Sequence, residues 1–340
     1  MKKLNVGIIG YGWVATAHIK TINASNFAQV TSIYSSRELQ DDKLSQEWGS
    51  KIISYTDLDK MLSDKKIDVV SICSYSYQHK DHAIAAAKAG KHIILEKPMA
   101  ISWDDCLAVK DAVEKANIKF CIGFELRYSN QSISTKAIID QGLIGDLHYG
   151  EVDYFHGIGP WYRQFYWNAK KNGGGSSLLT AGCHALDALL LYMGSDVEEV
   201  MSYESTSKNK IFEPYEYATT SVTILKFKSG RIAKCAVSVD CLQPYYFHTH
   251  LFGSDGSLLD NKLHSEKLKS DKSKWSQLSM QMLDSGDVED HPYKLQFDVF
   301  FESIHNDIVM PLTGLKEAIK THEIIFAADK SAATGKSVQL

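Results

Sequence analysis

The chain has 340 residues, of which 44% are hydrophobic and 11% aromatic, and its formal net charge at pH 7 is −4. This length predicts about two domains, and the apolar content is sufficient for two hydrophobic cores. A slightly acidic chain without a basic stripe argues against nucleic acid as a partner. No apolar stretch approaches the length of a membrane span, which argues against a membrane partner.

The cysteines and the N-terminus bear on the cellular compartment. Six cysteines are scattered without a C-x-x-C pair, which is typical of a reducing compartment and argues against a disulfide scaffold or a zinc site. The apolar run after Met1-Lys2-Lys3 is short, is interrupted by glycine and lacks a cleavage site, so it does not fit a signal peptide. We therefore expect a soluble cytoplasmic protein with no metal site.

A glycine turn at the start of the chain predicts a dinucleotide site. Residues 4–9 are apolar and predict a strand, and a helical stretch opens at Val14. Between them, Gly10 permits a tight turn and Gly12 permits close approach of a pyrophosphate to the backbone. The amides at the helix N-terminus, those of Trp13 and Val14 included, would face the phosphate oxygens. An ordinary strand-to-helix turn that uses glycine for its torsion angles is the alternative.

Strands and helices then alternate as far as about residue 124. The apolar runs at 29–34, 67–73, 91–95 and 119–124 predict strands, and 82–89 and 103–116 predict helices. Repeated units of this length predict an α/β fold with a doubly wound parallel sheet. Ligands of such sheets bind at the carboxyl ends of the strands.

The pattern changes after about residue 125. A helix is expected at 132–141, longer strands at 219–227, 231–239 and 248–252, and a last helix at 315–334. These elements predict an α+β domain on a large, mostly antiparallel sheet. We expect a Rossmann domain at 1–124 and a substrate-binding and oligomerisation domain at 125–340, whose final segment packs back on the first.

Two groups of polar residues could carry chemistry. Glu96-Lys97-Pro98 places a lysine at the carboxyl end of the fourth strand, where it could hydrogen-bond a substrate hydroxyl, although a solvated lysine beside a turn proline fits equally well. Thr180, His184 and Asp187 follow a triple glycine at helical spacing, which predicts one shared helix face. A histidine can exchange protons near neutral pH, but in an apolar helix it is more often a satisfied core residue.

These motifs together resemble the glucose-fructose oxidoreductase, inositol dehydrogenase and rhizopine catabolism family (Gfo/Idh/MocA) over nearly the whole chain. The resemblance rests on five segments, namely Gly7-Ile8-Ile9-Gly10-Tyr11-Gly12, Ala89-Gly90-Lys91-His92 leading to Glu96-Lys97-Pro98, Gly142-Leu143-Ile144-Gly145, the triple glycine leading to Gly182, His184 and Asp187, and Ser331-Ala332-Ala333-Thr334-Gly335-Lys336.

The resemblance implies an N-terminal Rossmann domain, a C-terminal open-faced sheet that forms homo-oligomer contacts, and hydride transfer between a nicotinamide cofactor and a ring hydroxyl or carbonyl of a sugar or polyol. It implies that Lys97 holds the reacting oxygen, that His184 is the general acid/base, and that Glu96 positions the cofactor. The Lys97-Pro98 bond is expected to be cis.

The chain departs from the family pattern at two places. Thr180 stands where many members have an aspartate, so it supplies no negative charge to Lys97 or His184. Ser74-Tyr75 replaces the usual Thr-Pro pair after the third strand, while His79 keeps its place. Tyr75 or Tyr77 is therefore expected to line the cofactor site with Ser74 and His79.

The end of the second strand bears on the choice of cofactor. Ser35, Ser36 and Arg37 stand where an acidic residue would bind the ribose hydroxyl of NAD. Hydroxyls and a guanidinium suit a 2′-phosphate, so we expect NADP to be preferred over NAD. Glu38 could still serve NAD.

Polar and aromatic residues that suit a carbohydrate lie in the second half of the chain. The expected substrate-binding residues are Arg127, His156, Trp161, Arg163, Thr180 and His184. Trp161 could instead pack between domains. Two other function classes use the same scaffold, a glycosidase-like enzyme that retains NAD and a non-catalytic nucleotide-binding sensor. A sensor needs neither Lys97 nor His184.

Overall fold

The computed structural model describes residues 2–157, 166–283, 288 and 291–340. The chain forms two compact units, one made of Met1–Glu125 with Val288–Ile319 and the other of Leu126–Asp287 with Lys320–Leu340. In the sequence, most of the second unit thus lies between the two segments that make up the first unit. Among the described residues, no helix is both long and apolar enough to cross a lipid bilayer.

The first unit contains a six-stranded parallel sheet in the order β3-β2-β1-β4-β5-β6. This is the strand order of a Rossmann fold, and it confirms the predicted doubly wound sheet. Its strands are β1 (Leu4–Ile9), β2 (Ala28–Tyr34), β3 (Ile53–Tyr55), β4 (Val69–Ile72), β5 (His92–Leu95) and β6 (Phe120–Ile122).

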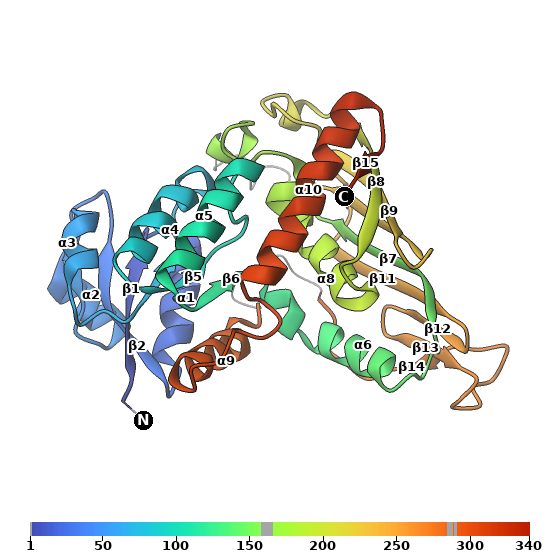
Figure 1. The fold of residues 1–340 in the computed structure, drawn as a ribbon, viewed down its shortest axis with the longest axis horizontal. Helices are drawn as coiled ribbons and strands as arrows, with labels where there is room; N and C mark the ends of the chain where they lie inside the picture. The colour runs from blue at the N-terminus through green and yellow to red at the C-terminus, as the bar shows by residue number, and fades with distance from the viewer. Residues whose placement is uncertain (1, 158–165, 284–287, 289–290) are drawn as a thin grey trace. The chain divides into compact units, whose positions relative to one another are not determined.

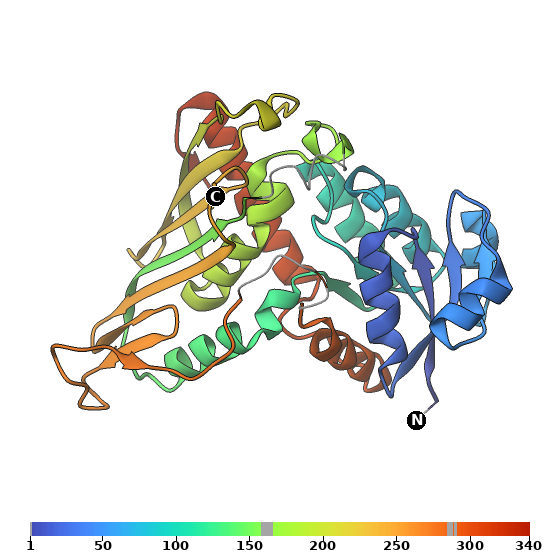
Figure 2. The ribbon, with the colours of Figure 1, turned by 180° about the vertical axis from the view of Figure 1, so that it is seen from behind.

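Helices cover both faces of this sheet. Figure 1 shows α4 and α5 side by side over one face, and Figure 2, from behind, shows α1 and α9 on the other. The predicted bounds of α5 are confirmed, whereas α2, α3 and α9 were not predicted. The helices are α1 (Trp13–Asn23), α2 (Asp41–Trp48), α3 (Leu58–Ser63), α4 (His79–Lys88), α5 (Trp103–Ala116) and α9 (Tyr293–His305).

The second unit contains a nine-stranded sheet in the order β14-β13-β12-β11-β7-β10-β9-β8-β15. All neighbours are antiparallel except β7 and β10, which confirms the mostly antiparallel sheet. The strands are β7 (Leu147–Phe155), β8 (Val197–Ser205), β9 (Thr220–Phe227), β10 (Ile232–Ser238), β11 (Tyr246–Gly253), β12 (Gly256–Leu259), β13 (Lys262–Ser265), β14 (Ser276–Gln277) and β15 (Val338–Gln339).

One face of the second sheet is covered by helices and the other is open. Figures 1 and 2 show α6 (Asn130–Asp140), α8 (Cys183–Met193) and the later part of α10 (Leu315–Thr334) along one face. Strand β9 alternates accordingly, with Leu225 buried and Ile224 48% exposed. An alternating strand of this kind is typical of a sheet with one face on a core.

A buried histidine connects α1 to the strand that ends before Lys97. His18 on α1 is fully buried, with Nδ1 2.7 Å from Ser71 Oγ on β4 and Nε2 2.8 Å from Glu96 Oε1. Its ring packs edge-on against Tyr293 and Phe297 of α9. Two strands, α1 and the late helix α9 therefore meet at one imidazole ring.

The surroundings of this pair favour its charged form. Burial by itself lowers the pKa of His18, but Cys73 and the Glu96 carboxylate raise it to about 10. Burial by itself raises the pKa of Glu96, but the hydrogen bond and charge of His18 hold it below its usual value. A buried charge needs such a partner, because an unpaired one is strongly destabilising.

We predict that the His18→Gln substitution flattens the dependence of stability on pH. The folded state holds the His18 proton up to about pH 10 and the unfolded state loses it near pH 6.5, so the stabilisation is complete below 6.5 and is lost as the pH rises to about 10. The variant should be less stable by about 3 kcal/mol near neutral pH. Urea unfolding across this pH range measures both effects. The half-buried His264 on β13 offers the control His264→Gln, and an equally steep pH dependence in His18→Gln would contradict the assignment.

Candidate functional site

The glycine turn after β1 fits a pyrophosphate. Gly10 has a φ of +93°, and a Cβ there would lie 2.9 Å from the backbone nitrogen of Ser74, so both torsion and space require glycine. Gly12 has an extended φ of −115°, and a Cβ there would have no described atom within 4 Å. The first turn of α1 begins at Trp13 and Val14 and contains no acidic residue, so its amides can receive an anion.

The segment after β2 folds back toward this turn. The Arg37 guanidinium donates from Nη2 to the backbone oxygen of Tyr11 at 3.1 Å. Ser35 is buried and its hydroxyl accepts the backbone N–H of Arg37, which fixes the tight bend after the strand. Ser36 and Arg37 are exposed. A guanidinium thus lies beside the turn that fits the phosphates.

A residue that follows β4, His79, hydrogen-bonds to the turn that contains Lys97. His79 is buried, with Nδ1 2.6 Å from the backbone oxygen of Pro98 and Nε2 3.0 Å from that of Ser74. Ser74 Oγ lies 2.8 Å from Nδ1 of His82 on α4. Tyr75 is exposed and stacks on Tyr77, with ring centroids 5.5 Å apart. The structure therefore places His79 against the backbone of both strand ends.

Lys97 lies two residues after the end of β5 and is joined to Pro98 by a cis peptide bond, as expected from the sequence. It is half-buried, and its backbone N–H donates to Glu96 Oε2 at 3.2 Å. The other carboxylate oxygen of Glu96 faces His18. The position of Lys97 is thus set by a buried ion pair that the sequence analysis did not predict. A polar residue on the buried face of α1 was the signal that could have indicated it.

The helix of the second unit that carries His184 begins differently from the prediction. Residues 178–182 form a π-helical turn that continues directly into α8 at Cys183, so Thr180, His184 and Asp187 lie in one helical segment whose first turn is wider than an α turn. The predicted helix is therefore present, and it differs from the expectation only in its first turn, because a π turn holds more residues than an α turn. A Cβ at Gly182 would lie 2.2 Å from Val237 Cγ2, so glycine allows this turn to pack against β10.

Thr180 and His184 are both buried in this segment. The Thr180 hydroxyl donates to Asn168 Oδ1 at 2.7 Å. Asn168 is held in turn, because its backbone oxygen accepts from the Tyr217 hydroxyl at 2.7 Å. Thr180, which stands where many family members have an aspartate, therefore hydrogen-bonds to a neutral side-chain amide.

Arg127 makes a buried ion pair with Asp187. Its Nε and Nη2 donate to the two carboxylate oxygens at 2.6 and 2.7 Å, and the Thr321 hydroxyl donates to the same carboxylate at 2.8 Å. Both Arg127 and Asp187 are more than nine-tenths buried. Because Asp187 lies three residues after His184, this bidentate pair fixes the helix that carries His184.

The other expected substrate residues are only partly described. His156 follows β7, its Nδ1 lies 3.2 Å from the Tyr154 hydroxyl, and its ring packs edge-on against Tyr245. Trp161 and Arg163 lie outside the described residues.

Similar proteins include dehydrogenases of cyclic polyols and sugars. The myo-inositol 2-dehydrogenase of Thermotoga maritima is 26% identical over 255 residues, which are 75% of this chain and 74% of that protein. The glucose-6-phosphate 3-dehydrogenase of Bacillus subtilis is 27% identical over 253 residues, 71% and 70% of the two chains. The solved structure of a levoglucosan dehydrogenase in complex with NADH superposes with a TM-score of 0.84 at 22% identity, covering 99% of each chain, and shows the same fold.

Family models match both parts of the chain. Residues 4–124 match the model GFO_IDH_MocA, described as an oxidoreductase family with an NAD-binding Rossmann fold. Residues 133–259 match the model of the GFO/IDH/MocA C-terminal domain. These matches confirm the resemblance on which the sequence analysis relied, and the chain belongs to the Gfo/Idh/MocA oxidoreductase family.

Proposed function

We propose that this protein is a nicotinamide-dependent dehydrogenase or reductase that acts on a ring hydroxyl or carbonyl of a sugar or polyol. The observation that carries the proposal is Lys97, held at the end of β5 by the buried Glu96–His18 pair, in a unit whose glycine turn fits a pyrophosphate. The names of the relatives, an inositol and a glucose-6-phosphate dehydrogenase, support the substrate class.

The bound cofactor supplies the hydride chemistry at the reacting carbon. Lys97 donates a hydrogen bond to the reacting oxygen and stabilises the negative charge that develops as this oxygen loses its proton. His184 takes that proton in the oxidation direction and returns it in the reduction direction. Because Thr180 is neutral and donates to Asn168, the two residues work without the carboxylate that many family members have there.

Arg37 supports a preference for NADP. Its guanidinium is anchored on the Tyr11 backbone oxygen, next to the turn that would hold the pyrophosphate. A guanidinium and the hydroxyls of Ser35 and Ser36 are suited to a 2′-phosphate, whereas a carboxylate would be needed for the ribose hydroxyls of NAD.

The open face of the second sheet supports a homo-oligomer. Several large apolar side chains of adjacent strands are exposed on it, which is unusual for a surface that meets only water. They are Tyr203 on β8, Val222 and Ile224 on β9, and Ile232 on β10. We propose that this face packs against a second copy of the chain.

The activity is tested by following nicotinamide absorbance while the protein is mixed with sugars, inositols and glycosides in the presence of NADP or NAD. We expect reduction with at least one cyclic polyol or sugar, and a loss of kcat of about 10²-fold or more in Lys97→Ala and His184→Asn. The exposed Lys88 of α4 gives the control Lys88→Ala. Cleavage of a glycoside without net cofactor turnover would indicate the glycosidase-like alternative. Cofactor binding without turnover, unaffected by Lys97→Ala, would indicate a sensor.

The preference for NADP is tested by the affinities of both cofactors. We expect NADP to bind about tenfold more tightly than NAD, and Arg37→Ala to remove this difference by weakening NADP alone. Gly12→Ala is the matched control, because its new methyl group would occupy the space left for the phosphates and weaken both cofactors equally. Tighter binding of NAD to the unsubstituted protein would refute the preference.

The oligomer is tested by sedimentation. Ile224→Glu should shift the protein to a smaller species, because it buries a charge in the proposed contact. Ile53 on β3 is similarly exposed, at 42%, but belongs to the first unit, so Ile53→Glu should leave the distribution unchanged. A monomeric unsubstituted protein would contradict the proposal.

A further inference from the structure

The open face of the second sheet brings a carboxylate and two imidazoles together. In the register of β7 and β11, Glu151 lies opposite His250 and Asp153 lies opposite His248. Since alternate residues of a strand share one face, these side chains point to the same side of the sheet. Neighbouring β10 adds Lys234, which pairs with Glu151.

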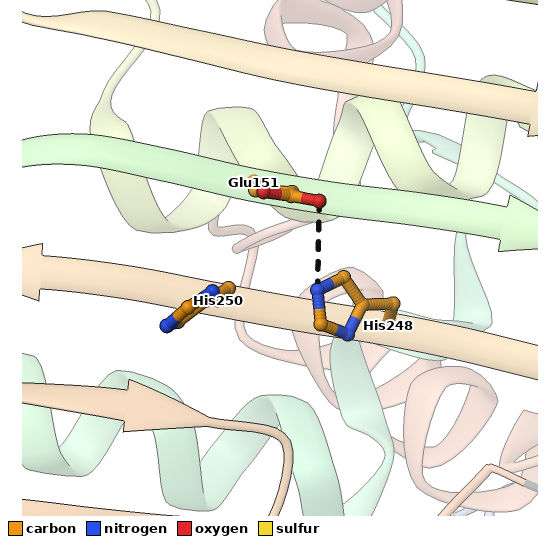
Figure 3. A group of neighbouring side chains, drawn as sticks. All are labelled: Glu151, His248 and His250. Carbon is orange, nitrogen blue, oxygen red and sulfur yellow. Dashed lines mark ion pairs between the residues drawn. The ribbon is translucent and has the colours of Figure 1, made fainter.

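The three groups have the spacing of metal ligands. One ligand atom of each of Glu151, His248 and His250 lies within 4.8 Å of the other two. Figure 3 shows the His248 ring on β11 reaching toward the Glu151 carboxylate on β7, and Nε2 lies 3.6 Å from Oε1. Two ligands of tetrahedral zinc, each about 2.1 Å from the metal, lie about 3.4 Å apart, so this pair is already close to the required distance.

A second observation indicates that His248 is prepared as a ligand. Its Nδ1 lies 3.1 Å from Asp260 Oδ1 and 2.8 Å from the Tyr246 hydroxyl, which itself donates to Asp260 Oδ2. The same carboxylate accepts the backbone N–H of Thr249, so it is firmly placed. A carboxylate at Nδ1 fixes the orientation of the ring and points Nε2 toward Glu151, as in the carboxylate–histidine–zinc arrangement.

Lys234 is the cation that now holds Glu151. Its Nζ lies 2.5 Å from Glu151 Oε1 and 2.9 Å from Asp153 Oδ2. Asp153 is buried and also accepts the backbone N–H of Ala236, so it can keep Lys234 when Glu151 turns away. The Tyr149 hydroxyl donates to the other carboxylate oxygen of Glu151 at 2.7 Å.

We propose that Glu151, His248 and His250 bind a divalent transition-metal ion, with Zn²⁺ the best fit. Two imidazoles and one carboxylate suit zinc and its neighbours in the transition series, whereas magnesium and calcium prefer oxygen ligands throughout. The ion would join β7 to β11 on the open face and keep a further coordination position for water or another ligand. The sequence analysis expected no metal on the basis of the cysteine spacing, whereas this proposal rests on the His248-x-His250 pattern of β11.

The test is a calorimetric titration with Zn²⁺ of the full-length protein, which carries no tag and has been treated with a chelator. We expect one ion per chain, and binding weakened by more than about tenfold in His248→Ala, His250→Ala and Glu151→Gln. His264→Ala, on β13 of the same sheet, is the matched control. Co²⁺ in place of Zn²⁺ should give a visible spectrum typical of a four-coordinate site, which is lost in His250→Ala.

Two further variants distinguish a metal site from a purely structural polar cluster. Lys234→Gln should bind Zn²⁺ several-fold more tightly, because it removes the competing cation and keeps a donor for Asp153. Asp260→Asn should weaken binding by roughly 10–100-fold while circular dichroism remains unchanged. Absence of Zn²⁺ binding, or binding that survives both histidine substitutions, would overturn the proposal. Affinity unchanged in Lys234→Gln would remove Glu151 from the ligand set.

Discussion

The first unit depends on the buried ion pair between Glu96 and His18. Glu96 is only 6% exposed, so its carboxylate needs a partner of opposite charge to remain ionised. His18 supplies the opposite charge from α1, and α9 closes the pocket with Tyr293 and Phe297. A buried pair of this kind stabilises the fold less through its attraction than through the cost of leaving either partner alone. The consequence for function is positional, because Lys97 follows Glu96 directly and its backbone donates to the same carboxylate.

The parallel sheet places the remaining parts of the first unit's site at one edge. Gly10, Arg37, Ser74 and Lys97 each follow a strand, and parallel strands end on the same side. Direct bonds then link these strand ends, since His79 spans from Ser74 to Pro98 and Arg37 reaches Tyr11. The cofactor expected from the family would therefore meet a surface that is already assembled.

The second unit also contains a buried ion pair, formed by Arg127 and Asp187. Its buried arginine and aspartate pair bidentately, and Thr321 on α10 satisfies the same carboxylate. This pair lies next to His184 in a helix that begins with a π turn, a feature often found at functional sites. On the far side of the unit, the open face carries exposed apolar residues of β9 and β10 and the polar row of Glu151, His248 and His250. One sheet thus has a face that packs against its own helices and an open face on which these side chains are exposed or half-buried.

Local sequence patterns determined several of the longer elements and the positions with a special backbone. The bounds of α5 and α10, the core strands of the first sheet, the turn at Gly10 and the lysine after β5 could all be predicted, because periodicity, glycine torsion and strand ends are properties of short segments. Short elements such as α2, β3 and α3 were missed because their patterns are too brief to show a period, and the 13-residue helix α9 was missed as well. The sequence analysis expected the final segment to return to the first domain, but the tertiary structure alone decided that residues 288–319 do so, and it alone decided the partners of Glu96 and Arg127. Each of these joins residues far apart in the chain, and such pairings depend on sheet register and helix packing, which no single segment encodes.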